Sequence, residues 1–193
     1  SREAGWIRLI YREVGRGTEG LAAMWRGTSV SVLGPLGRGF DTSLKHPLLV
    51  GGGMGLTPLL FFAAEHSNVS VLMGGRTREE VFWEEIYRPH VRECFVTTDD
   101  GSYGEQGFVT TLLPKLLTEG GYDGVAVCGP PVMMERVAGI ASEYGIPCEV
   151  SLEKRMACGL GACLSCAVDT KSGRRKVCKD GPVFPAGEVY YAS

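Results

Sequence analysis

Strands and helices alternate along the middle of this 193-residue sequence, and this alternation most constrains its fold. Short apolar runs rich in β-branched residues predict buried strands, and the stretches between them have helical spacing. The expected strands cover 47–53, 69–75, 93–100, 124–129 and 148–152, and the expected helices cover 57–66, 78–88, 108–117 and 130–144. Buried strands that alternate with helices of this length predict an α/β fold with a doubly wound parallel sheet.

The two ends of the sequence do not follow this pattern. Alternating apolar residues predict strands over 6–14 and 28–34, with a short helical turn over 19–25 between them. We therefore interpret residues 1–46 as the last part of a β-domain cut short at its N-terminus. Residues 47–152 form the predicted α/β domain. Residues 153–193 are rich in cysteine and glycine, and we expect a small appended domain with a hairpin over 167–178 whose tip is Ser172-Gly173.

Composition excludes several classes of partner. The formal net charge is −2, whereas a protein that binds nucleic acid usually carries a strong basic excess. No apolar run reaches 18 residues, so we expect no membrane span. The chain opens without a secretory signal and contains an odd number of cysteines, seven. A cytoplasmic protein with reduced thiols is therefore the expectation.

A glycine-rich turn follows the first strand of the α/β region. The stretch "GGGMGLTP" contains Gly51, Gly53 and Gly55 in a G-x-G-x-G pattern, which differs from the Rossmann G-x-G-x-x-G. Thr57 and Pro58 are the predicted N-cap and first residue of the next helix. Glycines at such a turn let backbone N–H groups approach a phosphate at a helix N-terminus. They can also serve the turn alone.

Four of the cysteines fall close together near the C-terminus. Cys158, Cys163 and Cys166 have the spacing C-x₄-C-x₂-C, and Cys178 follows. Structural zinc sites usually pair their cysteines in two distant knuckles, whereas three ligands from one loop are typical of plant-type [2Fe–2S] proteins. The spacing favours an iron–sulfur cluster, with zinc as the alternative.

Cys128 ends the predicted strand at 124–129. Open parallel sheets bind ligands beyond the carboxyl ends of their strands, so Cys128 could face a ligand there. A small buried hydrophobic side chain is the competing interpretation, and it also applies to Cys94 and Cys148 in other predicted strands. The basic run Arg174, Arg175 and Lys176 could dock an acidic partner or simply be a solvated hairpin tip.

Several segments together resemble a known family. "EKRMACGLGACLSC" with "KVCKDGPVF", "GGGMGLTP", "TTDDGSYGEQGFVT" and "CGPPVMM" are similar to the electron-transfer subunits of NAD-linked dihydroorotate dehydrogenases. Those subunits belong to the ferredoxin–NADP reductase superfamily of flavoproteins. The resemblance implies a relay of electrons between NAD(H), FAD and a [2Fe–2S] cluster. It also implies a catalytic partner subunit that contains FMN, assembles into a heterotetramer and acts on dihydroorotate in pyrimidine biosynthesis.

The resemblance assigns roles to particular residues. It implies that the cluster is held by Cys158, Cys163, Cys166 and Cys178, and that FAD is contacted by Ile10, Tyr11, Arg12, Gly17 and Thr18. It implies that NAD is bound by Gly51, Gly52, Gly53, Gly55, Thr57, Pro58, Gly129 and Pro130, with Cys128 beside the nicotinamide ring. The family's flavin-gripping Arg-Pro-x-Ser type motif has no counterpart here, so residues 1–46 are expected to be a remnant of the FAD-binding barrel that holds FAD weakly or not at all.

Three questions stay open at this point. A related iron–sulfur flavoprotein subunit, from a bifurcating transhydrogenase or a sulfhydrogenase, would carry the same motifs. A nucleotide-binding module with structural zinc would use the same glycines and cysteines. NAD is the expected dinucleotide, although Arg76 and Arg78 could pair with the 2′-phosphate of NADP.

Overall fold

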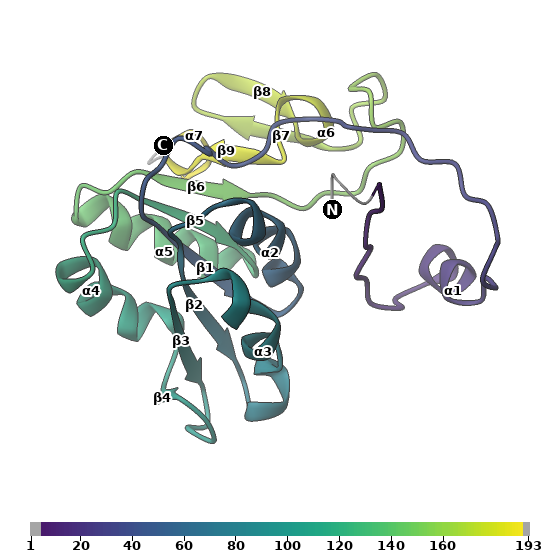
Figure 1. Ribbon diagram of the computed structural model, residues 1–193. Coiled ribbons are helices and arrows are strands. Elements are labelled where there is room, and N and C mark those ends of the chain that lie inside the picture. The colour runs from purple at the N-terminus through teal and green to yellow at the C-terminus, as the bar shows by residue number, and fades with distance from the viewer. Residues whose placement is uncertain (1–4, 191–193) are drawn as a thin grey trace. The chain divides into compact units, whose positions relative to one another are not determined.

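A mixed sheet organises residues 35–190 in the computed structural model, which describes residues 5–190 (Figure 1). The strands lie in the order β4-β3-β2-β1-β5-β6-β9, and every neighbouring pair is parallel except β6 with β9. Their bounds are β1 Pro47–Gly52, β2 Ser70–Gly75, β3 Glu93–Thr98, β4 Glu105–Gln106, β5 Gly124–Cys128, β6 Cys148–Ser151 and β9 Val183–Pro185. The strand order reverses between β1 and β5, as in a doubly wound sheet, so the predicted fold class is confirmed.

Helices cover both faces of the sheet. They and the short 3₁₀ turns (η) are η1 Gly53–Gly55, α2 Leu56–Glu65, η2 Arg78–Val81, α3 Trp83–Tyr87, η3 Arg88–His90, α4 Val109–Glu119, α5 Pro131–Glu143, α6 Val177–Asp180 and α7 Ala186–Val189. Leu48 and Val50 pack into one core with side chains of α4 and α5, while Gly51 faces Leu56 of α2 on the other side. Figure 1 shows α4 and α5 on one face and α2 and α3 on the other. None of the helices in residues 5–190 is long and apolar enough to cross a membrane.

The helix after the glycine turn begins earlier than predicted. The 3₁₀ turn η1 runs directly into α2, so Leu56 is the first helical residue and Gly55 is the N-cap. Thr57 therefore stands inside the first turn, and the prediction that it caps the helix is wrong. Its hydroxyl is buried and finds no hydrogen-bond partner in the part of the chain that the structure describes.

Two further boundaries differ from expectation. The helix predicted over 78–88 is divided into η2, α3 and η3, and Pro89 lies within the last of these turns. The predicted hairpin exists as β7 (Ala167–Thr170) and β8 (Gly173–Lys176). Its two-residue loop is Lys171-Ser172, not Ser172-Gly173, because Gly173 pairs with Thr170 as the first residue of β8.

The C-terminal segment is joined to the α/β sheet. The strand β9 pairs antiparallel with β6, where Phe184 lies opposite Val150. Cys166, Val177 and Phe184 belong to the same core cluster as the central strands. Contacts within the chain divide it into two compact units, with the division between Gly34 and Pro35. The domain boundaries expected near residues 47 and 153 stay a prediction, which is based on the cofactor that each segment is expected to bind.

Residues 5–34 form a unit of their own, which contains the helix α1 (Arg16–Ala22). The strands predicted over 6–14 and 28–34 do not form, so that prediction is wrong for the described residues. A strand is stabilised by hydrogen bonds to its neighbours, and no neighbouring strand is present within this unit. Its large apolar side chains are consequently exposed, as Ile7, Val14 and Trp25 illustrate. Residues 1–4 and 191–193, at the outer ends of two expected domains, lie outside the described residues.

Candidate functional site

The glycine turn lies where the strand order of the sheet reverses. β1 and β5 are neighbours, and Gly51 at the end of β1 lies opposite Cys128 at the end of β5. The turns that follow these strands lead into the N-termini of α2 and α5. In open α/β sheets, this position is the crevice in which ligands bind. The predicted glycine turn and the Cys128–Pro130 segment therefore come together at the carboxyl ends of the central strands.

Gly55 lets the turn pack against the backbone that ends β5. A β-carbon built on Gly55 would lie 2.2 Å from the carbonyl oxygen of Cys128 and 2.6 Å from the nitrogen of Gly129. One on Gly51 would lie 2.4 Å from Cδ2 of Leu56. These two glycines are required by close packing inside the protein. Because they have no side chains, the two turns can approach each other, and the space beside these glycines is filled by protein atoms rather than by a ligand.

Gly53 has a different role from its neighbours. Its φ is +56°, a conformation that favours glycine, and a β-carbon there would meet no atom within 4 Å. The residue is exposed, so its backbone faces open space at the start of α2. Backbone N–H groups and the helix dipole at such a position attract an anion, such as the phosphate of a nucleotide. Pro58 and Pro130, in the segments that follow β1 and β5, are also exposed.

Cys128 is buried at the end of β5. Burial raises the pKa of its thiol to about 11, while a hydrogen bond with Ser151 acts in the opposite direction. The thiol is therefore neutral at pH 7. A neutral thiol is a poor nucleophile, so Cys128 can shape or contact a ligand site but is not set up for thiolate chemistry.

The four clustered cysteines occupy a loop and the start of α6. Cys158 and Cys163 lie in the loop between β6 and β7, while Cys166 directly precedes β7 and Cys178 lies in α6. Backbone amides point at two of the sulfurs. The Cys158 Sγ accepts N–H groups from Leu160 at 3.4 Å and Ala162 at 3.3 Å, and the Cys166 Sγ accepts the Cys178 N–H at 3.4 Å.

These hydrogen bonds favour thiolates in the loop. The pKa of Cys158 is lowered to about 6, chiefly by the backbone N–H of Cys163 and then by that of Leu160. The pKa of Cys166 is lowered mainly by the backbone N–H of Cys178. The pKa of Cys178 is raised, mainly because its thiol is hydrogen-bonded to the Cys166 sulfur. A loop that stabilises thiolate sulfur suits a metal ligand set.

The thiols associate as two pairs. Hydrogen bonds link Cys158 with Cys163 and Cys166 with Cys178. Among residues 5–190, no group of three or more His, Cys, Asp or Glu side chains gathers in a way that could hold a metal ion. One zinc ion needs four ligands around a single point, whereas a two-iron cluster takes two thiolates at each iron. Two pairs of thiols are compatible with the ligand set of a two-iron centre.

The expected flavin contacts lie in the separate unit of residues 5–34. Tyr11 and Arg12 are exposed there. The Thr18 hydroxyl accepts the Val14 N–H at 2.9 Å and donates to the Gly15 carbonyl at 2.9 Å, so it is engaged at the start of α1. Ile10 is partly buried, and Gly17 lies within α1. The assignment of these residues to FAD stays a prediction.

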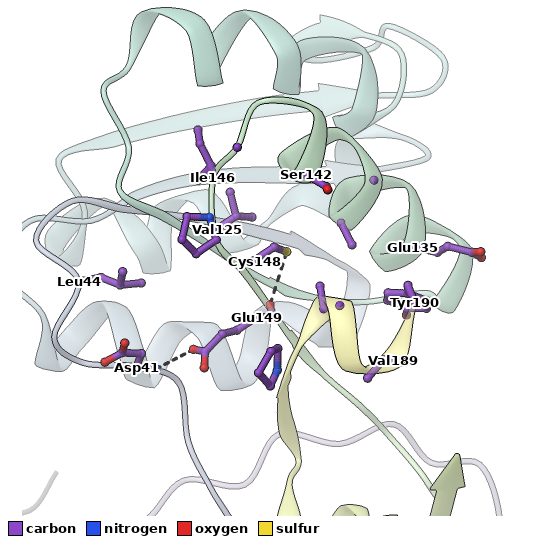
Figure 2. A pocket seen from close by; sticks show the side chains of 17 residues that line it. Asp41, Leu44, Val125, Glu135, Ser142, Ile146, Cys148, Glu149, Val189 and Tyr190 are labelled. Carbon is purple, nitrogen blue, oxygen red and sulfur yellow. Dashed lines mark hydrogen bonds between the residues drawn. The ribbon is translucent and has the colours of Figure 1, made fainter. Parts of the chain in front are cut away.

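A cavity of about 1020 Å³, lined in part by the first residues of β5 and β6, was not predicted (Figure 2). It is lined by residues of β5, β6, α5 and α7, among them Cys148 and Glu135, and by Tyr190 directly after α7. Figure 2 shows Glu149 turned toward Asp41, whose backbone N–H it accepts at 2.7 Å. Cys148, predicted to be core, is half-buried here. Side chains from distant segments form this cavity, so no local pattern announces it.

Comparison with known proteins identifies relatives over most of the chain. Residues 153–190 match the family model of the iron–sulfur cluster binding domain of dihydroorotate dehydrogenase B. Relatives named as the electron transfer subunit of dihydroorotate dehydrogenase B (NAD(+)) include one from Clostridium perfringens, 38% identical over 96% of this chain and 76% of its own length. Another, from Fusobacterium nucleatum, is 38% identical over 95% of this chain and 74% of its own length.

A solved structure is similar as well. A chain of the NADH-dependent reduced ferredoxin-NADP oxidoreductase, described for flavin-based electron bifurcation, superimposes with a TM-score of 0.81. It is 33% identical in sequence, and the match covers 93% of this chain and 67% of that one.

Proposed function

The chain belongs to the family of electron transfer subunits of dihydroorotate dehydrogenase B, and we propose that it relays electrons between NAD(H) and the catalytic subunit of that enzyme. The relay uses FAD and one [2Fe–2S] cluster, and the catalytic subunit contains FMN. The established role of such an enzyme is the oxidation of dihydroorotate to orotate in pyrimidine biosynthesis.

The observation that carries this proposal is the set of four cysteines in two pairs. Cys158, Cys163, Cys166 and Cys178 lie within the segment that matches the cluster-binding family model. A [2Fe–2S] cluster is bound by four thiolates, and amide hydrogen bonds to sulfur tune its potential. The amides of Leu160, Ala162 and Cys178 already point at cysteine sulfur.

Each part of the chain then has a task. FAD and the cluster held by the four cysteines would, when bound, allow a two-electron hydride transfer to continue as single-electron steps. The turn at Gly53 holds the pyrophosphate of the dinucleotide with backbone N–H groups. Cys128, neutral and buried at the end of β5, would line the nicotinamide end of the site. Tyr11, Arg12 and Thr18 contribute to flavin binding in the unit of residues 5–34.

A second candidate shares the same relay but has another partner. The similar solved structure belongs to an oxidoreductase that performs flavin-based electron bifurcation. In that case the chain would pass electrons to a bifurcating subunit. Purification of the chain from its source cell with its bound partner, followed by identification of the partner, distinguishes the two.

Metal and flavin analysis tests the proposal directly. We expect about two iron and two acid-labile sulfide per chain, with the visible absorption of an iron–sulfur protein. Bound flavin is extracted and measured on the same sample. A colourless protein that contains one zinc per chain would contradict the relay, because zinc has no redox chemistry.

The surface around the cysteine loop suits a protein partner. Met156, Leu160 and Leu164 lie within nine residues of the sequence and are 49%, 61% and 58% exposed. Residues 153–180 carry seven basic and three acidic side chains, although the whole chain has a formal net charge of −2. A β-carbon on Gly161 would meet Cδ of Lys176 at 3.1 Å, so this positive charge lies close to the loop. The catalytic subunit, in a heterotetramer, would present an apolar face with an acidic rim.

Leu164 offers a sharp test of this surface. Its φ is +61°, a left-handed conformation that costs a leucine about 1–2 kcal/mol. Leu164→Gly removes the side chain and relieves this strain, so the free energy of unfolding should not fall. We expect affinity for the catalytic subunit to drop by about tenfold, as for a central apolar contact. Titration of the catalytic subunit measures the loss.

Phe61→Ala provides the matched control. Phe61 is 52% exposed on α2, away from the cysteine loop in the sequence. This variant should bind the catalytic subunit as tightly as the native chain. Unchanged binding by Leu164→Gly would move the interface to another face of the molecule.

A further inference from the structure

An arginine and a glutamate form a clasp directly after β2. Arg76 follows the last residue of the strand, and its Nε donates to Oε1 of Glu80 at 2.8 Å. The backbone N–H of Arg76 donates to Oε2 of the same carboxylate at 2.9 Å. Both oxygens of Glu80 are thus directed to one residue. The Arg76 side chain is 80% exposed, so the clasp lies at the surface.

The end of β3 lies beside this clasp. The Asp99 N–H donates to the Gly75 carbonyl at 3.1 Å, and the Asp100 N–H donates to the Arg76 carbonyl at 3.2 Å. Asp100 Oδ1 accepts both the N–H and the hydroxyl of Ser102, which lowers the pKa of this carboxyl. The loops after the two strands therefore form one connected surface.

Negative charge predominates on this surface. The carboxylates are those of Glu79, Glu80, Asp99 and Asp100, and the guanidinium groups are those of Arg76 and Arg78. Arg78 is also engaged, because its guanidinium lies over the Tyr103 ring at 5.2 Å and its backbone N–H donates to the Ser102 hydroxyl at 2.9 Å. The electrostatic field here opposes a further dianion.

The topology puts this surface on the adenosine side of the dinucleotide site, a step that rests on the proposed function. The pyrophosphate turn follows β1, the nicotinamide side follows β5, and β2 and β3 lie beyond β1 on the other side. In dinucleotide-binding folds, the residues after the next strand meet the adenosine ribose. A carboxylate there accepts hydrogen bonds from the 2′-hydroxyl of NAD, whereas an arginine accommodates the 2′-phosphate of NADP.

We propose that Glu80 sets the coenzyme choice of this chain by holding Arg76 in the clasp. Arg76 is the first side chain after β2, the position from which a guanidinium could pair with a 2′-phosphate. The Glu80 carboxylate pairs with that guanidinium through its Nε and Nη2 atoms and offsets part of its charge. Arg76 consequently adds less attraction for NADP(H), and the surplus carboxylates favour the ribose hydroxyls of NAD(H).

Binding of two redox-inactive probes tests the role of Glu80. ADP-ribose and 2′-phospho-ADP-ribose are titrated against the native chain, Glu80→Gln and the double variant Glu80→Gln/Arg76→Ala. Glutamine keeps an acceptor for the Arg76 N–H but removes the charge. We expect the preference for ADP-ribose to shrink by roughly five- to tenfold in Glu80→Gln, because a charged hydrogen bond to phosphate becomes available. The double variant should lose this gain.

Asp169→Asn is the matched control, since Asp169 is an exposed carboxylate that pairs with Arg174 at 3.7 Å on the distant hairpin. It changes net charge by the same amount and should leave the preference unaltered. Retained binding of ADP-ribose shows that each variant is folded.

Two results would overturn the proposal in distinguishable ways. If every protein binds ADP-ribose and Glu80→Gln keeps the native preference, Glu80 has no part in coenzyme choice, and the dinucleotide site stands. If the native chain binds neither probe, the dinucleotide site itself is wrong, and the role of Glu80 falls with it.

Discussion

Replacement of Cys163 by serine should stop NAD⁺-linked oxidation of dihydroorotate while NADH still reduces a soluble dye in the flavin-loaded protein. An alcohol is a hard ligand that iron–sulfur centres hold poorly. Cys163 also contributes hydrogen bonds to the Cys158 sulfur, so the substitution disturbs one pair of thiols. Transfer of hydride from NADH to flavin needs no thiolate from this loop. Dye reduction and coupled activity are measured with the catalytic subunit present.

Cys94→Ser is the control for a thiol outside the loop. Cys94 lies in β3, and burial raises the pKa of its thiol to about 11, so it behaves as a neutral packing side chain. This variant should keep both activities. Coupled oxidation of dihydroorotate by Cys163→Ser at the native rate would show that electrons reach the partner by another route.

The α/β part of the fold could be predicted because its signals are local. The strands β1, β2 and β5 contain short apolar runs, β3 and β6 are short and contain β-branched residues, and α4 has amphipathic spacing. The strand β9 was missed because it has three residues, ends in Pro185 and is defined only by its pairing with β6. The strands predicted over residues 6–14 and 28–34 do not form, although their local pattern is right, because no neighbouring strand pairs with them in the described unit. Alternation alone cannot make a strand without a partner.

The candidate site likewise has some features that the local sequence indicates and others that depend on tertiary contacts. The spacing of the four cysteines indicated a cluster, but their association as two pairs depends on how α6 folds back toward Cys166. The G-x-G-x-G turn indicated a nucleotide, yet the distinct roles of Gly53 and Gly55 emerge only from their surroundings. Arg76 and Glu80 stand four residues apart in the sequence but outside any α-helix of the described residues, so their spacing alone did not indicate a pair. Its significance comes from its place after β2, beside the loop that follows β3.

Substitution of Gly55 should have the second large effect, on both stability and dinucleotide binding. An alanine β-carbon would lie 2.2 Å from the oxygen and 2.4 Å from the carbonyl carbon of Cys128. These atoms belong to the backbone of the central strand β5, which cannot move aside as a flexible side chain can. We expect Gly55→Ala to lower the free energy of unfolding by roughly 3 kcal/mol or more, measured by urea denaturation.

Gly53→Ala separates packing from ligand contact in the same turn. Its β-carbon meets no atom within 4 Å, so only the backbone strain at φ +56° remains, which costs about 1–2 kcal/mol. The added methyl group nevertheless stands where the pyrophosphate must approach the backbone. Gly53→Ala should therefore weaken binding of NADH while the protein loses much less stability than Gly55→Ala. Equal losses of stability in the two variants would contradict this packing, because the β-carbon of Gly55→Ala meets the backbone of β5 whereas that of Gly53→Ala meets no atom.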